Sequence, residues 1–193
     1  MNTSSKTPGA VNIRAAQQGD VDAVADIESM AFRTDWMGRD RLERGILSGD
    51  VLVAEMDHRV VGFCIVRFRR GKPSANLVTI AVSRDAEGSG LGTTLLNSAE
   101  AEAARRGCRL LRLEVRADNY RAIALYQRAG FRWIGKKPNY YADGIAAIRM
   151  HKSLGEREFW LPRLILERLA FAVAEMLRKK RAGPRRLPER RWL

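Results

Sequence analysis

The sequence predicts a single α/β domain in which strands and helices mix and neighbouring strands form antiparallel hairpins. Three observations support this prediction. The apolar strand Leu77–Val82 runs into a glycine-rich loop that opens an amphipathic helix, an alternating strand runs into a helix ended by Gly130, and two apolar strands flank a tight turn at Asp57-His58. A chain of 193 residues with 46% hydrophobic content is long enough to bury one mixed core.

The N-terminal half of the domain begins with a short strand and two helices. Val24, Ile27 and Ala31 recur at helical spacing, and Asp20 stands where a helix cap is expected. The predicted elements are, in order, a strand at Val11–Arg14, helices at Asp20–Phe32 and Arg39–Leu47, and strands at Val51–Glu55, Val60–Arg69 and Leu77–Val82.

The C-terminal half alternates between the same two kinds of element. Leu111, Leu113 and Val115 alternate with charged residues, which predicts a strand with one apolar face. Asp118 and Asn119 follow as helix caps. The predicted elements are a helix at Leu95–Arg106 that ends at Gly107, this strand, a short helix around Ile123–Gln127, and strands at Arg132–Lys136 and Ile145–His151.

The segment Thr79–Gly92, TIAVSRDAEGSGLG, has the composition of an anion-binding site. Its glycines let the backbone turn tightly and approach a ligand, and the free N–H groups of the helix start face that ligand at the positive end of the helix dipole. A pyrophosphate fits such a site. The spacing Gly88-x-Gly90-x-Gly92 differs from that of a dinucleotide-binding loop, and the loop lacks the lysine of a triphosphate-binding loop.

Several blocks of the sequence match one family pattern. They are IAV (80–82), the glycine loop, LEVRADN (113–119), ALYQRAGF (124–131) and YYADG (140–144). Together they resemble the GNAT superfamily of acyl-coenzyme A N-acyltransferases, and more narrowly the ribosomal-protein-alanine N-acetyltransferases. The resemblance implies an acetyltransferase domain over residues 10–152 that uses acetyl-CoA. It also implies a mixed, mainly antiparallel central sheet flanked by helices, whose two central strands splay apart to admit the cofactor arm.

The resemblance also assigns cofactor contacts residue by residue. Backbone groups of Ile80, Ala81 and Val82 would contact the cofactor arm, and the Val82 N–H would polarise the thioester oxygen as an oxyanion donor. Asn119 matches the residue that bonds the pantetheine arm, and it can also serve as a helix cap alone. The residues expected to cradle the pyrophosphate are Gly88, Ser89, Gly90, Leu91, Gly92 and Thr93.

Glu87 departs from the family pattern, which usually has Gln or Arg at this position. A carboxylate near a pyrophosphate repels it, although Arg84 is close enough in sequence to compensate. Because backbone N–H groups do most of the holding in this kind of loop, we expect binding to persist with altered affinity.

Acyl transfer from a thioester to an amine needs a neutral amine, a polarised carbonyl and a protonated leaving thiolate. Glu114 is the candidate general base, directly or through one water, and the resemblance supports this role because matching enzymes carry Glu here. Tyr126 is the candidate general acid, with an ordinary pKa of ~10 against ~8.5 for a thiol. The alternatives are a solvated strand carboxylate and a buried core tyrosine. Tyr140 and Tyr141 resemble tyrosines that line the acceptor entrance, or they form an exposed hairpin pair.

Other chemistries find little support in the sequence. His58 and His151 are too few and too scattered for a metal site, so we expect none. Cys64 and Cys108 lie in apolar contexts and are predicted to be reduced core residues rather than a disulfide. The N-terminal segment has no apolar run of a secretory signal, and the expected location is the cytoplasm.

Residues 155–193 form an extension beyond the family domain. Apolar residues recur at helical spacing from Phe159 to Leu177, and the tail at 178–193 holds eight basic residues against Glu189, within a chain of net charge +13. Charge interrupts the helix too often for it to span a bilayer. Residues 159–193 are expected to contact a ribosome, RNA or an anionic membrane, or else to pack on the domain and end in a solvated tail.

The acceptor is predicted less closely than the reaction. The resemblance implies an acetyl-CoA-dependent N-acetyltransferase that acts on a protein or peptide N-terminus, such as that of a ribosomal protein, whose α-amine has a pKa of ~7.7–8.0 and is readily deprotonated. A lysine or a small-molecule amine is the alternative acceptor, and a non-catalytic acyl-CoA-binding module is the further alternative. The presence of both Glu114 and Tyr126 argues against the non-catalytic module.

Overall fold

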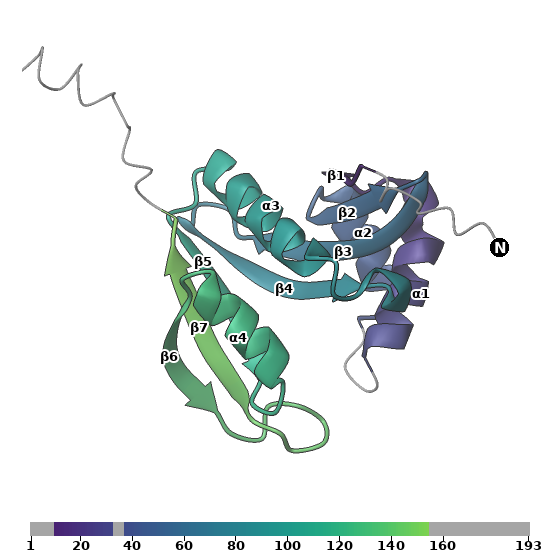
Figure 1. The fold of residues 1–193 in the computed structure, drawn as a ribbon. Helices are drawn as coiled ribbons and strands as arrows, with labels where there is room; N and C mark the ends of the chain where they lie inside the picture. Colours follow the sequence, from purple (N-terminus) through teal and green to yellow (C-terminus); the bar gives the residue numbers. More distant parts are fainter. Residues whose placement is uncertain (1–9, 33–36, 155–193) are drawn as a thin grey trace, which may run out of the picture. The chain divides into compact units, whose positions relative to one another are not determined.

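A seven-stranded sheet forms the centre of the described domain (Figure 1). The computed structural model describes residues 10–32 and 37–154. The strands lie in the order β1-β2-β3-β4-β5-β7-β6, and every neighbouring pair is antiparallel except β4 and β5, which confirms the predicted fold class. The strands are β1 Asn12–Ala15, β2 Val51–Met56, β3 Arg59–Phe68, β4 Ser74–Val82, β5 Leu110–Arg116, β6 Arg132–Lys137 and β7 Ala147–Ser153.

The predicted helices form between these strands, and the differences from prediction lie at element ends. β4 begins at Ser74 rather than Leu77, and α3 begins at Leu91, directly after the glycine loop. Gly107 and Gly130 follow α3 and α4 at positive φ, as C-terminal glycines do. The helical segments are η1 Gln18–Asp20, α1 Val21–Ala31, α2 Arg39–Leu47, η2 Arg84–Ala86, α3 Leu91–Arg105 and α4 Tyr120–Arg128.

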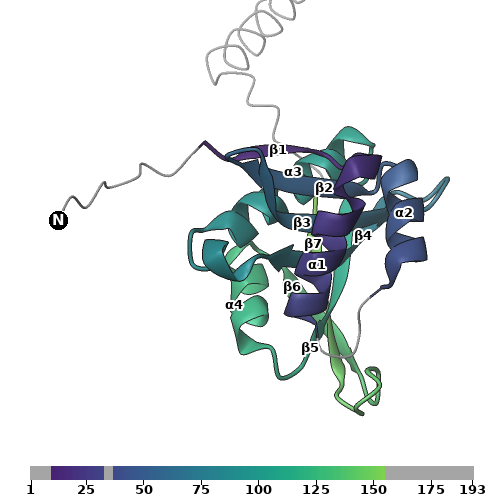
Figure 2. The same cartoon turned by 90° about the vertical axis from the view of Figure 1, so that its right-hand side faces the viewer.

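The helices cover the two faces of the sheet unevenly. α3 and α4 cover one face, where Leu95 and Leu111 are fully buried. α1 and α2 lie along the other face (Figure 2), where they bury Val24, Leu42 and Phe63 against β2, β3 and the end of β4. The α1 and α2 core includes no side chain of β5, β6 or β7. This half of the second face instead carries the charged side chains that alternate with the apolar residues of β5.

β4 and β5 pair over only part of their length. Their parallel register ends at Leu77 and Leu113, whereas β4 continues to Val82 and β5 to Arg116. Beyond the paired segment the two strands diverge (Figure 1), so the edge of residues 78–82 that faces β5 has no strand partner. This is the splay that the resemblance implies.

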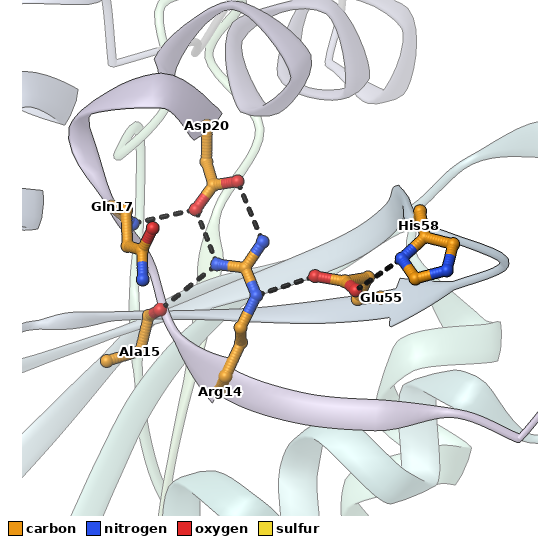
Figure 3. A network of polar contacts seen from close by, with 6 residues as sticks. All are labelled: Arg14, Ala15, Gln17, Asp20, Glu55 and His58. Carbon is orange, nitrogen blue, oxygen red and sulfur yellow. Dashed lines mark hydrogen bonds and ion pairs between the residues drawn. The ribbon is translucent and has the colours of Figure 1, made fainter.

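Asp20 does not cap α1 with its side chain, contrary to the prediction. Its carboxylate accepts two hydrogen bonds from the Arg14 guanidinium, at 2.7 and 3.0 Å, and one from the Gln17 backbone N–H at 2.7 Å (Figure 3). A guanidinium is a stronger donor than a helix N–H. Arg14 Nε also donates a hydrogen bond to Glu55 Oε2, and Glu55 Oε1 lies 3.9 Å from His58 Nδ1. The Arg14 bonds hold the pKa of Asp20 below its usual value, so their contribution to stability is lost as the pH falls through that lowered pKa.

Some predictions concern residues outside the described ranges. These are the predictions for the N-terminal segment up to residue 9 and for the extension at 155–193, and residues 33–36 also lie outside the described ranges. Within the part that the structure describes, no helix is long and apolar enough to cross a membrane. Cys64 and Cys108 are both buried with free thiols, as predicted for reduced core residues.

Candidate active site

The splay between β4 and β5 opens a cleft of about 550 Å³, which we call the cofactor cleft. Ile80, Ala81 and Val82 line it from β4, and Ala122 and Leu125 line it from α4. The glycine loop, the first turn of α3 and the C-terminal end of α1, with Met30, Ala31 and Phe32, also line it. The cleft therefore combines apolar walls with an exposed strand edge, and both come from elements that the sequence predicts.

The Val82 N–H points toward this cleft. The next N–H along the chain, that of extended Ser83, donates to the Val61 carbonyl of β3 at 2.9 Å. Successive N–H groups of an extended chain point to opposite sides. The Val82 N–H therefore points away from β3, to the side where no strand pairs with it, and it can bond a ligand carbonyl.

The glycine loop presents free N–H groups at the start of α3. Gly88 and Gly90 have φ of +79° and +86°, a region that other residues adopt only at a cost. Within the described residues, the N–H groups of Gly88, Gly90, Leu91 and Gly92 donate to no carbonyl, whereas the Thr93 N–H bonds Gly90 at 2.9 Å. The first turn of α3 carries no acidic residue. Free donors at the positive end of a helix fit a diphosphate.

Three arginines and one carboxylate also line the cofactor cleft. The Glu87 carboxylate lies 2.9 Å from Arg121 of α4, so its neutralising partner comes from across the cleft rather than from neighbouring Arg84. Arg84 and Arg128 form no ion pair with a described residue. They are therefore the cations of the cleft that remain to face an anion.

Asn119 and Ser89 hold the backbone around the cleft. Asn119 Oδ1 accepts a hydrogen bond from the Ala122 N–H at 3.0 Å, which confirms the predicted cap, and Asn119 also lines the cleft. Of the predicted cofactor residues, Ser89 alone does not line it. The Ser89 hydroxyl donates to the Ala86 carbonyl at 2.6 Å, which stabilises the turn of the loop.

Glu114 lies on β5 at the first position past its pairing with β4. Its neighbours Leu113 and Val115 are buried under α4, so Glu114 belongs to the opposite face of the sheet, with its side chain 32% exposed. Glu114 Oε1 accepts a hydrogen bond from Lys137 at 3.1 Å and lies 3.9 Å from Arg149 Nε. Glu114 does not line the cofactor cleft. It lines a second hollow of about 710 Å³ on its own face of the sheet.

Tyr126 lies on the other side of the sheet from Glu114. α4 buries it in the core, where its ring centroid is 5.7 Å from that of Phe131. Burial, with smaller contributions from Tyr141 and Cys64, raises the pKa of the Tyr126 hydroxyl. The hydroxyl therefore keeps its proton at neutral pH. The structure places the two predicted catalytic residues on opposite faces, and neither lines the cofactor cleft.

Tyr140 and Tyr141 lie in the turn between β6 and β7, with perpendicular rings 5.1 Å apart. The Lys137 ammonium lies 4.8 Å from the Tyr140 ring centroid, and the Arg116 guanidinium lies 4.8 Å from that of Tyr141. Lys137 is the same ammonium that binds Glu114. The aromatic pair and the candidate base therefore belong to one cluster.

Arg116 fastens this turn to the end of β5. Its guanidinium binds Asp118 at 3.0 Å and Asp143 at 2.7 Å. These bonds hold the pKa values of both carboxyls below their usual range. Asp118 therefore binds Arg116 and leaves the cap of α4 to Asn119, so one of the two predicted capping residues is wrong.

Sequence reasoning missed the cations that contact predicted site residues. Lys137, Arg149 and Arg121 lie far along the chain from the carboxylates they bind. The basic pair before YYADG is a signal that points toward Lys137, but no local pattern indicates Arg121 or Arg149. Among residues 10–32 and 37–154, no three His, Cys, Asp or Glu side chains gather as a metal site.

Comparisons with known proteins agree with this geometry. A model of the acetyltransferase (GNAT) family matches residues 21–131. An uncharacterised N-acetyltransferase of Methanocaldococcus jannaschii is 36% identical over 144 residues, which cover 72% of this chain and 90% of that protein. A Bacillus subtilis protein assigned to the ribosomal-protein-alanine N-acetyltransferases is 32% identical, covering 78% of this chain and 99% of its own length. The crystal structure of the Escherichia coli ribosomal-protein-alanine N-acetyltransferase matches with a TM-score of 0.66 and 28% identity. The match covers 79% of this chain and 99% of that protein's chain.

The residues of the cofactor cleft fit acetyl-CoA. Free N–H groups at the start of α3 suit its diphosphate, the apolar walls from β4 and α4 suit its pantetheine arm, and the Val82 N–H suits its thioester oxygen. The family match extends over the greater part of the chain and includes this cleft. The chain therefore belongs to the GNAT family of acetyltransferases and is an N-acetyltransferase that uses acetyl-CoA.

Proposed function

We propose that this N-acetyltransferase acetylates the α-amine of a protein N-terminus, in the manner of the ribosomal-protein-alanine N-acetyltransferases it resembles. The placement of Glu114 carries the proposal. Its carboxylate lines a hollow separate from the cofactor cleft, at the level where β4 and β5 part. An acceptor chain can therefore approach Glu114 through a hollow other than the cleft that holds the acyl donor.

Backbone groups hold the acyl donor in this proposal. The N–H groups of Gly88, Gly90, Leu91 and Gly92 bind the diphosphate. Acetyl-CoA supplies a thioester whose carbonyl carbon is open to attack by an amine. The Val82 N–H donates to the carbonyl oxygen and stabilises the negative charge that develops there during attack.

Glu114 removes the proton that the acceptor amine must lose, directly or through one water. Lys137 and Arg149 both lie against Oε1, which leaves Oε2 as the accepting oxygen among the contacts the structure describes. The Lys137 charge also disfavours a second cation beside it, so an acceptor amine there is held more readily in its neutral form. An α-amine has an ordinary pKa of ~7.7–8.0, whereas that of a lysine is ~10.4. A smaller decrease in pKa therefore makes the α-amine neutral at physiological pH.

Tyr126 assists the departure of the leaving sulfur. Because burial raises the pKa of its hydroxyl, full proton transfer to a thiolate of pKa ~8.5 is more uphill than for a free phenol. A hydrogen bond from the protonated hydroxyl to the sulfur requires no such transfer. In this proposal Tyr126 therefore acts as a hydrogen-bond donor that stabilises the leaving group.

The test is acetyl transfer from radiolabelled acetyl-CoA to three acceptors. These are a peptide with N-terminal alanine, the same peptide with a blocked N-terminus and an internal lysine, and a small polyamine. We expect label on the free α-amine. Label on lysine or on the polyamine instead would assign the enzyme to those acceptors. Binding of acetyl-CoA without any transfer would support the non-catalytic module.

A further inference from the structure

We propose that the hollow beside Glu114 binds an acidic segment of the acceptor protein, a few residues downstream of its N-terminus. We call this hollow the basic groove. The inference rests on the proposed function, because it places the acceptor α-amine at Glu114. Among the described residues, the charged side chains that line the groove are Arg69, Lys72, Arg109, Arg112 and Arg149, against the carboxylate of Glu114.

Most of these cations have no counter-charge of their own. Arg69, Lys72, Arg109 and Arg112 are exposed and form no ion pair with any described residue. Arg149 lies 3.9 Å from Glu114, and Lys137 competes for the same carboxylate oxygen. Unpaired like charges around a concave surface create a field that attracts an anion. The described domain therefore supplies no anionic partner for these four cations.

The strand register places one of these cations, Arg112, directly along the strand from the candidate base. Arg112 lies two residues before Glu114 on β5, so both side chains belong to the same face, roughly 6.6 Å apart along the strand. Arg112 lies opposite Asn76 of β4, and Glu114 lies opposite Arg149 of β7. An extended peptide has the same repeat along its length. A chain that starts with its α-amine at Glu114, beside Arg149, and runs along this face of β5 meets Arg112 about two residues further on.

The chemistry of the lining favours a peptide over a nucleic acid. None of the described residues that line the groove is aromatic, so they offer unstacked bases no ring on which to stack. Glu114 at one end repels a phosphate backbone. Guanidinium groups bind carboxylates through paired N–H donors, and the Ser74 hydroxyl and the Asn76 amide supply hydrogen bonds for a peptide main chain.

The experiment compares three peptides that share an N-terminal alanine and the next two residues. The following five positions are acidic, neutral or basic. We expect kcat/KM to be roughly tenfold higher for the acidic than for the neutral peptide at low salt, and the difference to shrink as ionic strength rises. Equal values for all three peptides overturn the inference and leave the proposed function intact. Failure to acetylate any peptide counts against the proposed function instead.

Charge-reversal variants locate the effect and test binding independently of activity. Arg112→Glu should abolish the preference for the acidic peptide, whereas Arg44→Glu, an equal charge change at an exposed position of α2, should preserve it. Arg112→Gln serves if Arg112→Glu does not fold. Fluorescence anisotropy of a labelled acidic peptide should show the same pattern whether or not acetyl transfer occurs. Unchanged peptide binding in both Arg112 variants overturns the inference. The same holds if a labelled single-stranded RNA binds more tightly than the peptide and loses that binding in the Arg112 variants.

Discussion

The two sides of the site are built from different parts of the chain. The main-chain groups of the cofactor cleft are the free N–H groups of the glycine loop, with two glycines at positive φ, and the unpaired edge of β4 at Val82. The proposed acceptor side consists of side chains, where Glu114, Lys137 and Tyr140 meet from β5, β6 and the following turn. A site made of main chain depends on local conformation, whereas one made of side chains depends on long-range pairing.

This difference explains how one scaffold can keep its donor and change its acceptor. The free donors of the glycine loop depend on backbone angles, and most side chains can vary without moving them. On the acceptor side, one substitution removes an ion pair or an aromatic contact outright. Substitutions in the cofactor cleft should therefore change acetyl-CoA binding, whereas substitutions on the proposed acceptor side should change acceptor turnover.

Glu114→Gln should produce the largest effect. The amide keeps the shape of the side chain but cannot take a proton, so kcat should fall by roughly 10²-fold or more. Acetyl-CoA affinity, measured by calorimetry, should stay unchanged because Glu114 does not line the cofactor cleft. Full activity at every pH would show that another group or water removes the proton.

Tyr126→Phe is expected to lower kcat by roughly 10²-fold through loss of one donor to the leaving sulfur. The ring remains packed near Phe131, so thermal stability should change little. The decrease in kcat should be the same for acceptors of lower amine pKa, because the hydroxyl acts on the leaving group and not on the amine. A loss that depends on the acceptor amine would instead place Tyr126 on the acceptor side of the reaction.

Local sequence patterns predicted the main-chain features of the cofactor cleft well. Glycine spacing indicated the loop, alternation indicated β5, and the cap at Asn119 formed as expected, because each depends on neighbours in sequence. Asp20 and Asp118 failed as caps because an arginine outside the helix outcompeted the helix N–H groups.

The side-chain contacts of the acceptor side could not be read from the sequence. Lys137 reaches Glu114 only because β6 pairs with β7, and β7 with β5, in one particular register. A bulge between Trp133 and Gly135 shifts that register. The hydrophobic pattern within one segment does not predict the register between two strands.

Gly90→Ala should weaken acetyl-CoA binding about tenfold while acceptor KM stays near its original value. The added Cβ meets no atom within 4 Å, so the cost comes from φ of +86°, which is unfavourable for a residue with a side chain by about 1–2 kcal/mol. Gly92→Ala is the control, because it needs no positive φ and its Cβ meets only Leu125 at 3.8 Å. Equal losses in both variants would point to close approach of the ligand rather than to loop conformation.

Asp143→Asn should raise acceptor KM by about threefold and leave acetyl-CoA affinity unchanged. It removes the carboxylate through which the tyrosine turn binds Arg116. The Arg116 bonds lower the pKa of Asp143, so this contact is complete above the ordinary carboxyl pKa and is lost as the pH falls through the lowered value. The Gly144 amide signal, followed by NMR from neutral into acid pH, should move in that window for the wild type alone. A similar movement in the variant would assign it to another carboxyl.

Glu87→Gln tests whether the main-chain account of the cofactor cleft is sufficient. Removal of a carboxylate beside the diphosphate should tighten acetyl-CoA binding about twofold to threefold at low salt, because the repulsion disappears and Arg121 becomes free to face the anion. The effect is small because the Glu87 side chain is 49% exposed, and it should fade as ionic strength rises. Asp85→Asn, an equal charge change on the same loop but outside the cleft lining, is the control and should change the Kd less. Weaker binding in Glu87→Gln would mean that the Glu87–Arg121 bridge holds α4 beside the loop. The cofactor side would then depend on long-range side-chain pairing in the same way as the acceptor side.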